Sequence, residues 1–237
     1  MRKFKCPLIA LGVLALSAFG VSAPGASAQS CSGPGTKRWT IKTSLPPNPN
    51  VDNPKAIALP DLLALAPAKG VTNNDADFEM ARIPAFPNSL NVKEGDIVRT
   101  TGWLYLVATE ADCDYHIQIS TKPRTTTDKP TPDDDCMVVE APKPDFVDDA
   151  DLKQRTDTVR NYIKTKMLRN KEPSTRGSVM IHAVCVRVSG QLFYDDSHLK
   201  TNGDVEPRGK KGLLSHTLWE LHPITDFKII PSSSCPS

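Results

Sequence analysis

The sequence lacks the short motifs that identify well-known classes of enzyme. It contains no G-x-S-x-G nucleophile elbow, no H-E-x-x-H zinc-protease motif and no phosphate-binding P-loop. It also has no C-x-x-C pair, which argues against a structural zinc knuckle. Enzymes that depend on these signatures are therefore excluded, and any chemistry must come from other residues.

The sequence also lacks an excess of positive charge. The full chain has 29 basic and 27 acidic residues, and residues 1–28 hold Arg2, Lys3 and Lys5 but no acidic residue. Without that segment 26 basic residues face 27 acidic ones, a net charge of −1. A nonspecific nucleic-acid binder normally carries a clear positive excess, because counterion release dominates its affinity. Binding of nucleic acid or oligosaccharide would have to depend on a local patch.

Only one long apolar run is present, and it stands at the N-terminus. A basic head precedes the run Pro7–Val21, and Ala26-Ser27-Ala28 follows as a small-residue cleavage pattern. We expect residues 1–28 to be a signal peptide cleaved near Ala28, which makes the protein secreted or periplasmic. The run is short for a membrane span, and no span is expected. A lipoprotein acylated at Cys31 is the alternative, with a poor lipobox.

Five cysteines follow the predicted signal peptide, and export permits disulfides between them. An odd number leaves at least one thiol unpaired. Two bridges among five cysteines can be drawn in 15 ways, so the pairing stays open. Cys185 stands in an apolar strand and is interpreted as a packing residue. The five are Cys31, Cys113, Cys136, Cys185 and Cys235.

The composition changes near residue 95. Residues 29–95 hold nine prolines and little periodicity, which predicts an extension packed on a globular domain, with a short helix near Pro60–Leu65. Residues 96–231 are rich in strand-forming residues and long enough to bury a core. Residues 232–237 remain as a C-terminal tail.

The pattern after residue 95 predicts five strands and one helix. The helix, capped by Asp148 or Asp149 and ended by Pro173, falls between the third and fourth strands. This order is typical of a five-stranded OB-type barrel, mainly β. Gly190 is placed for a bulge or bend in the fourth strand. The strands are expected at 97–107, 114–120, 136–141, 179–194 and 218–230.

Polar residues interrupt these apolar strands. His116 and Glu140 are expected to be cross-strand neighbours on the second and third strands. Glu220 and His222 share one face of the last strand, opposite Trp219 and Leu221. The alternative for the last pair is an edge or bulged strand whose polar residues face water. For the first pair, the alternative is a hydrogen bond with a structural role only.

A further group, Asp195 with His198, follows the fourth strand, where the simplest interpretation is an Asx-capped turn. Histidines beside carboxylates serve as general acids and bases, or hold a divalent metal that activates water. The basic loop with Arg208, Lys210 and Lys211 can meet a phosphate in the region where OB folds contact ligands, or be ordinary solvated surface.

Four motifs resemble those of a widespread family of small bacterial proteins, often secreted and mostly hypothetical. They match its E-x-D-x-D-Y-H, E-x-P, G-x-x-F-[FY]-D-x-x-H and E-[LI]-H-P stretches, and Ile41-Lys42-Thr43 is similar to its V-K-T entry. The resemblance implies a shared site without naming its chemistry. The matching segments here are Glu110–His116, Glu140–Pro142, Gly190–His198 and Glu220–Pro223.

The sequence therefore predicts an exported, nuclease-like OB-fold protein with a ligand-binding or hydrolytic site; a divalent metal is compatible with its residues. The alternative is a binding module without catalysis that uses the barrel face and the 207–212 loop. In a third interpretation, the His–Glu pairs only brace the barrel against the extension. The candidate site residues are His116, Glu140, His198, Glu220 and His222.

Overall fold

The computed structural model describes residues 31, 33, 35 and 37–236. The predicted signal peptide, residues 1–28, lies outside this part of the chain. Residues Cys31–Ser237 form one compact unit. Among the described residues, no helix combines the length and the apolar character that a membrane crossing requires.

The protein is mainly β. Its principal sheet contains β1 (Lys55–Ala56), β2 (Ile97–Thr109), β3 (Tyr115–Ser120), β4 (Cys136–Ala141), β5 (Ser178–Tyr194) and β8 (Trp219–Ile229). A separate hairpin joins β6 (Arg208–Lys210) to β7 (Leu213–Ser215). The helices are α1 (Trp39–Lys42), α2 (Leu59–Leu63) and α3 (Ala150–Met167), with short 3₁₀ turns at Ala76–Phe78, Pro144–Phe146, Asp196–His198 and Ser232–Ser234.

Each of the five long strands pairs with two other long strands, and β2 also pairs with the short strand β1. The sheet order is β1-β2-β3-β4-β8-β5, and β5 pairs with β2 as well. All these long-strand pairings are antiparallel except β4 with β8, which is parallel at Val139 and Leu221. The five predicted strands and their boundaries agree with these elements to within two residues. The parallel contact brings the third and fifth predicted strands side by side.

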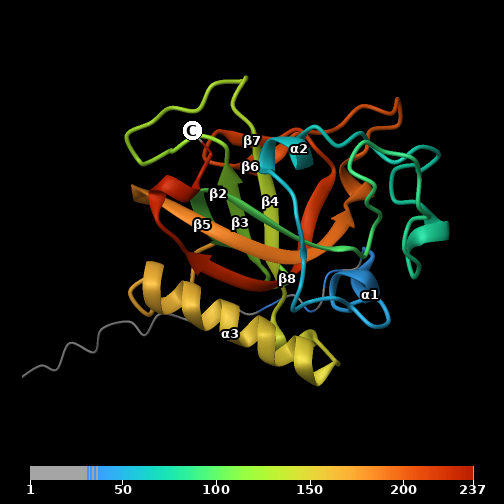
Figure 1. Cartoon of the computed structure of the whole chain (residues 1–237), viewed down its shortest axis with the longest axis horizontal. Coiled ribbons are helices and arrows are strands. Elements are labelled where there is room, and N and C mark those ends of the chain that lie inside the picture. The colour runs from blue at the N-terminus through green and yellow to red at the C-terminus, as the bar shows by residue number, and fades with distance from the viewer. Residues whose placement is uncertain (1–30, 32, 34, 36, 237) are drawn as a thin grey trace, which may run out of the picture. The chain divides into compact units, whose positions relative to one another are not determined.

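Helix α3 begins where the sequence predicts it and lies along one side of the strands (Figure 1). It ends at Met167, before the predicted end at Pro173, because Arg169 and Asn170 adopt positive φ. Asp149 caps its start by accepting a hydrogen bond from the Leu152 backbone N–H, which satisfies one of the free donors of the first turn. Leu152, Val159 and Ile163 are buried on one stripe of the helix. This apolar stripe attaches the helix to the sheet.

A bulge bends β5 at Gly190, as predicted. The register with β8 shifts on both sides of this residue. A Cβ atom placed here would lie 2.8 Å from the Pro223 carbonyl oxygen and 2.9 Å from Ile224 Cα. Only glycine permits this approach of the two backbones, which brings the end of β5 close to β8.

The extension contributes to the same apolar core as the strands. Leu59 and Leu62 of α2 are fully buried, and the core also includes Val71, Ile83 and Val92. The predicted short helix near Pro60 corresponds to α2. The Trp219 indole N–H donates to the Ala66 carbonyl oxygen at 2.9 Å, so the last strand is also bonded to the extension.

Two disulfides close the fold, Cys31–Cys113 and Cys185–Cys235, and Cys136 is a buried free thiol. The packing role predicted for Cys185 is therefore wrong, because this residue holds the C-terminal segment on β5. Its apolar surroundings hid a partner 50 residues away. Two disulfides indicate an oxidising compartment, extracellular or periplasmic.

Candidate functional site

His116 and Glu140 form the cross-strand pair that the sequence predicts. They stand opposite each other in the β3–β4 register, and His116 Nδ1 lies 2.9 Å from Glu140 Oε1. Their side chains are only 6% and 8% exposed. A second carboxylate, Glu110 Oε1, lies 3.3 Å from the same ring nitrogen. The buried Nε2 atom of His116 has no hydrogen-bond partner among the described residues.

His222 lies behind this pair and is completely buried. Its Nδ1 atom is 3.1 Å from Glu140 Oε2, and its Nε2 atom is 3.3 Å from Asp114 Oδ2. The parallel contact of β4 with β8 places Glu140 beside this ring. The interpretation in which Glu220 and His222 face water is wrong, since their exposures are 2% and 0%. The sequence of the last strand alone did not show that this strand pairs with β4, and this pairing is what buries the two side chains.

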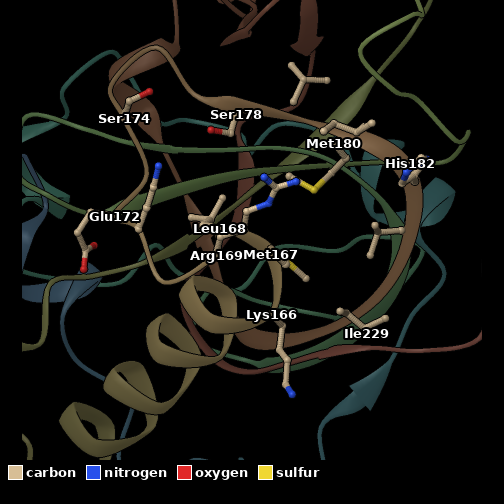
Figure 2. Close-up of a pocket in the computed structure, with 14 residues that line it drawn as sticks. Lys166, Met167, Leu168, Arg169, Glu172, Ser174, Ser178, Met180, His182 and Ile229 are labelled. Carbon is tan, nitrogen blue, oxygen red and sulfur yellow. The ribbon is translucent and has the colours of Figure 1, made fainter.

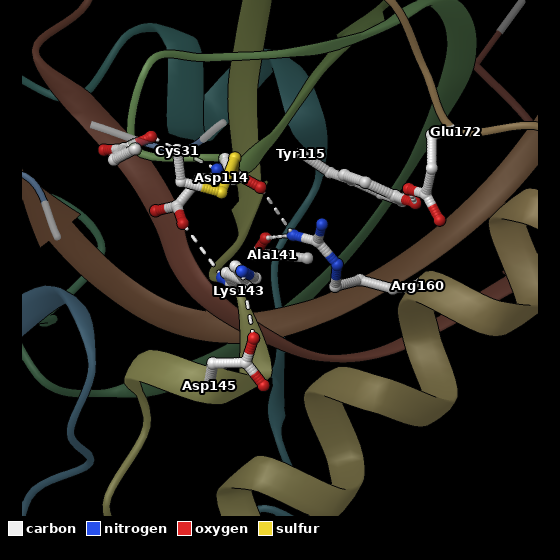
Figure 3. The surroundings of a disulfide bond; sticks show 10 residues. Cys31, Asp114, Tyr115, Ala141, Lys143, Asp145, Arg160 and Glu172 are labelled. Atoms are coloured by element: carbon white, nitrogen blue, oxygen red, sulfur yellow. Dashed lines mark hydrogen bonds and ion pairs between the residues drawn. A yellow bond between two sulfur atoms is a disulfide. The ribbon is translucent and has the colours of Figure 1, made fainter. Parts of the chain in front are cut away.

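Asp114, His222, Glu140 and His116 thus form a buried row in which acids and imidazoles alternate; we call it the Asp–His–Glu–His row. One end is fixed by the Asp114 Oδ1 atom, which accepts from the Lys143 backbone N–H at 3.0 Å (Figure 3). Near that end, the Cys31–Cys113 disulfide lies next to Asp114 in the chain. The other end of the row is His116.

The row favours charged imidazoles. Burial alone would lower the pKa of His222, but contacts with Asp114, Glu140 and Glu220 raise it well above its usual value. Burial alone would also lower the pKa of His116, but Glu140 and Glu110 raise it above its usual value. For Glu140, burial would raise the pKa, but His116 and His222 hold it well below its usual range.

Glu220 is held by a different cation. The Arg208 guanidinium donates to Glu220 Oε1 through Nε at 3.0 Å and through Nη2 at 2.7 Å. Arg208 also donates to the Thr217 carbonyl oxygen at 2.7 Å and is only 8% exposed. The predicted 207–212 loop is thus the β6–β7 hairpin, and Arg208 is engaged inside the protein.

Asp195 and Lys42 complete the charged cluster. The pKa of Asp195, which burial alone would raise, is lowered to about 2 by Lys42, Arg208 and His198. Burial would lower the pKa of the half-buried Lys42, but Asp195, Glu140, Glu220 and Asp114 raise it above its usual value. Asp195 Oδ1 also accepts from the Ser197 backbone N–H, the Asx cap that the sequence predicts.

A cavity of about 340 Å³ opens onto this cluster and brings together most of the predicted site. It contains His116, Glu140, His198, Glu220, Arg208 and Lys210 from the prediction. His222 does not line it but supports Glu140 from behind. Lys211 is exposed, and its carbonyl oxygen accepts from the Tyr105 hydroxyl. The lining residues are Lys42, Glu110, His116, Glu140, Asp195, Ser197, His198, Arg208, Gly209, Lys210 and Glu220.

Sequence reasoning missed the roles of Lys42, Glu110 and Asp114. Each stands inside one of the segments whose resemblance to a bacterial family is described in the sequence analysis, and that resemblance was the available signal. Lys42 reaches the cavity from α1, more than sixty residues before the nearest strand residue of the site, so no local pattern points to it. The spacing of Arg208 and Glu220 in the sequence also gave no indication that they form an ion pair.

Two groups of residues offer metal-ligating atoms close together, Glu110–His116–Glu140 and Asp114–Glu140–His222. In the second group the carboxylates face opposite nitrogens of the His222 ring, the arrangement of a doubly protonated imidazolium. In the first group both carboxylates approach His116 Nδ1, a geometry that suits one shared proton or one divalent cation. The first group is therefore the better metal candidate.

The row and the cavity can position a ligand, exchange a proton at His116 and hold cationic side chains against acidic ones. No family model matches this chain, and no curated protein matches it.

Proposed function

We propose that the protein is an exported OB-type β-barrel with nuclease-like architecture. The proposal is supported by the strand pairings, in which β2, β3, β4, β8 and β5 follow one another and β5 returns to β2. The α3 helix between β4 and β5 and the parallel contact of β4 with β8 agree with an OB topology. The N-terminal cleavage pattern and the two disulfides support export.

The function proposed for the cavity is hydrolysis of a small polar ligand, with His116 as the general base. The observation that carries this proposal is the contact of Glu140 with His116 Nδ1 at 2.9 Å, on a residue of the cavity wall whose buried Nε2 atom has no hydrogen-bond partner among the described residues. A carboxylate at one ring nitrogen fixes the tautomer whose other nitrogen takes a proton. The cavity volume suits a small molecule or one group of a larger one.

In this step neutral His116 takes a proton from water at Nε2, and the water oxygen forms a bond to the electrophilic centre of the ligand. The bond to the leaving group then breaks, and the proton held by His116 passes to that group. Because the pKa of His116 is raised, the neutral base becomes abundant only above the usual value of 6.5. The rate should therefore increase as pH rises through the pKa that His116 has in the folded protein.

The test measures turnover of nitrophenyl esters, phosphodiesters and glycosides by the chain and by its His116→Asn variant, each from pH 6 to pH 10. Loss of turnover by roughly 100-fold or more in the variant, with unchanged melting, supports a base at this position. His182→Asn is the matched control, because His182 is exposed and outside the cavity. Turnover that survives in His116→Asn would overturn the proposal.

A second candidate is a binding module in which the row only braces the fold. It is favoured by the complete burial of His222, which cannot contact a ligand in the cavity directly. In that case short oligonucleotides or oligosaccharides would bind without being cleaved. A further possibility is that the site holds a divalent metal in the Glu110–His116–Glu140 group. Elemental analysis of the purified chain tests this, because such a metal would be present in stoichiometric amount.

A further inference from the structure

A second concave surface lies at the C-terminal end of α3 and shares no lining residue with the His–Glu cavity. This groove has a volume of about 470 Å³ and runs between the end of α3, the first half of β5 and Ile229 (Figure 2). We call it the α3–β5 groove. Its wall is mainly apolar and includes Met167, Leu168, Val179, Met180, Ile181, Val184 and Ile229.

Exposed apolar side chains concentrate at this groove. Among the described residues only three large apolar side chains are strongly exposed: Met80, Ile181 at 64% and Ile229 at 43%. Two of the three therefore line the same groove. Single exposed apolar residues need no explanation, but two on one concave apolar wall indicate a surface that an apolar partner covers.

The rim of the groove carries positive charge. Lys166, Arg169 and Lys171 are exposed, and none has a carboxylate within 4 Å among the described residues. The acidic residue of the wall, Glu172, already pairs with Lys164 at 3.2 Å and contacts the Tyr115 hydroxyl. The charge of the groove is therefore positive and uncompensated, although the chain after residue 28 is close to neutral.

Basic residues at a helix C-terminus also interact with the helix dipole, which is the simplest explanation for Lys166. In Figure 2 Lys166 points away from the groove. Arg169 and Lys171 come after the last residue of α3, and the dipole does not account for the exposed Ile181 and Ile229 beside them. A ligand that combines an anionic group with an apolar body explains both features.

We propose that the α3–β5 groove binds a free anionic amphiphile, a molecule with a carboxylate or phosphate head and an alkyl tail. Arg169 and Lys171 hold the head by charge-assisted hydrogen bonds at the rim. The tail lies on Met167, Leu168, Met180 and the two exposed isoleucines. The concave shape favours a single chain in solution over a bilayer surface, because a bilayer cannot enter a groove.

Isothermal titration calorimetry of the purified chain tests the proposal with decanoate, hexanoate and the uncharged decyl glucoside. Decanoate should bind with one-to-one stoichiometry. Affinity should fall roughly fourfold for each methylene removed toward hexanoate, the change expected from buried alkyl area. Decyl glucoside should bind roughly tenfold more weakly than decanoate because it has no anionic head.

Three double variants separate the two features. Arg169→Gln with Lys171→Gln should weaken decanoate roughly tenfold and leave decyl glucoside unchanged, whereas Ile181→Ser with Ile229→Ser should weaken both. Lys153→Gln with Lys200→Gln removes two exposed charges outside the groove and should change neither. Since all six positions are at the surface, melting temperatures close to that of the parent chain are expected.

Four results would overturn the proposal. These are no saturable binding of decanoate, equal affinity for hexanoate and decanoate, and wild-type affinity in the two groove variants. The fourth is tight binding of an acidic peptide or of phosphatidylglycerol vesicles that decanoate does not displace. The His116→Asn variant should bind decanoate normally, so failure of the hydrolytic proposal leaves this one intact.

Discussion

His222 is the residue on which the buried charges of the site depend most. It is fully buried and within 3.3 Å of both Asp114 and Glu140. His222→Ala would leave Asp114 buried without an ion pair among the described residues and Glu140 with His116 as its remaining ion-pair partner. We therefore expect a loss of roughly 3–5 kcal/mol in the free energy of unfolding. Urea denaturation checks this value. His216→Ala, which removes an exposed contact with Asp135, should cost less than about 1 kcal/mol. Equal losses in the two variants would contradict the prediction.

The same residue predicts how stability depends on pH. The pKa of His222 is raised in the folded protein, so its contribution is complete below about 6.5 and is lost as pH rises through the folded pKa. The pKa of Glu140 is lowered, so its contribution is present above 4.5 and is lost as pH falls through the folded pKa. Stability should therefore decrease on both sides of a neutral plateau.

Denaturation midpoints measured from pH 2 to pH 10 test this dependence. The decrease on the alkaline side should be smaller in His222→Ala than in the wild-type chain, because the variant has lost the group that deprotonates there. An alkaline decrease of the same size in both proteins would show that other groups cause it. His216→Ala again serves as the control and should follow the wild-type curve.

Single residues also mark the limit of sequence reasoning here. The His116–Glu140 pair was predictable, because both lie on strands joined by one loop, and a hairpin symmetric about Asp128 places positions 116 and 140 opposite each other. The contact of His222 with Glu140 was not, since it depends on a parallel contact between strands far apart in the sequence. The pairing of Arg208 with Glu220 was hidden for another reason, because a basic loop with glycine is usually solvated.

At the scale of elements, the strands and α3 were predictable because their patterns are local. Alternation predicts a single strand, the Asp149 cap predicts the start of one helix, and Gly190 predicts a bend in one strand. Partners between elements were not predictable in the same way. The Cys185–Cys235 disulfide is one example, since five cysteines allow many pairings and an apolar strand suggests packing.

That disulfide fixes the segment after β8 to β5, and Trp103 Nε1 donates to the Pro236 carbonyl oxygen nearby. Replacing both cysteines with serine should destabilise the fold by about 2–4 kcal/mol, because the open chain regains loop entropy when it unfolds. Thermal and urea unfolding measure the change. Reduction of the wild-type chain in denaturant opens both disulfides, so it should lower the midpoint at least as much as the double variant does. An unchanged midpoint in the double variant would contradict the prediction.

At the scale of the whole molecule, a buried ion pair within the extension is hydrogen-bonded to the end of β5. Arg38 is 1% exposed and donates to both Glu94 carboxylate oxygens at 2.8 Å and to the Tyr194 carbonyl oxygen at 2.6 Å. Glu94 in turn accepts from the Tyr194 backbone N–H at 2.9 Å. The end of β5 is therefore bonded to two separate parts of the extension, close to Asp195 of the cavity.

The extension should consequently be required for folding. A chain that starts at residue 96 loses Leu59 and Leu62, each worth about 1.5–3 kcal/mol when fully buried, together with the Arg38–Glu94 pair. These losses are comparable with the 5–15 kcal/mol that typically stabilises a whole domain. We expect residues 96–237 to show no cooperative thermal transition by circular dichroism, whereas a chain starting at residue 29 keeps it. A cooperative transition of similar midpoint in the shorter chain would show that the strands form an independent domain.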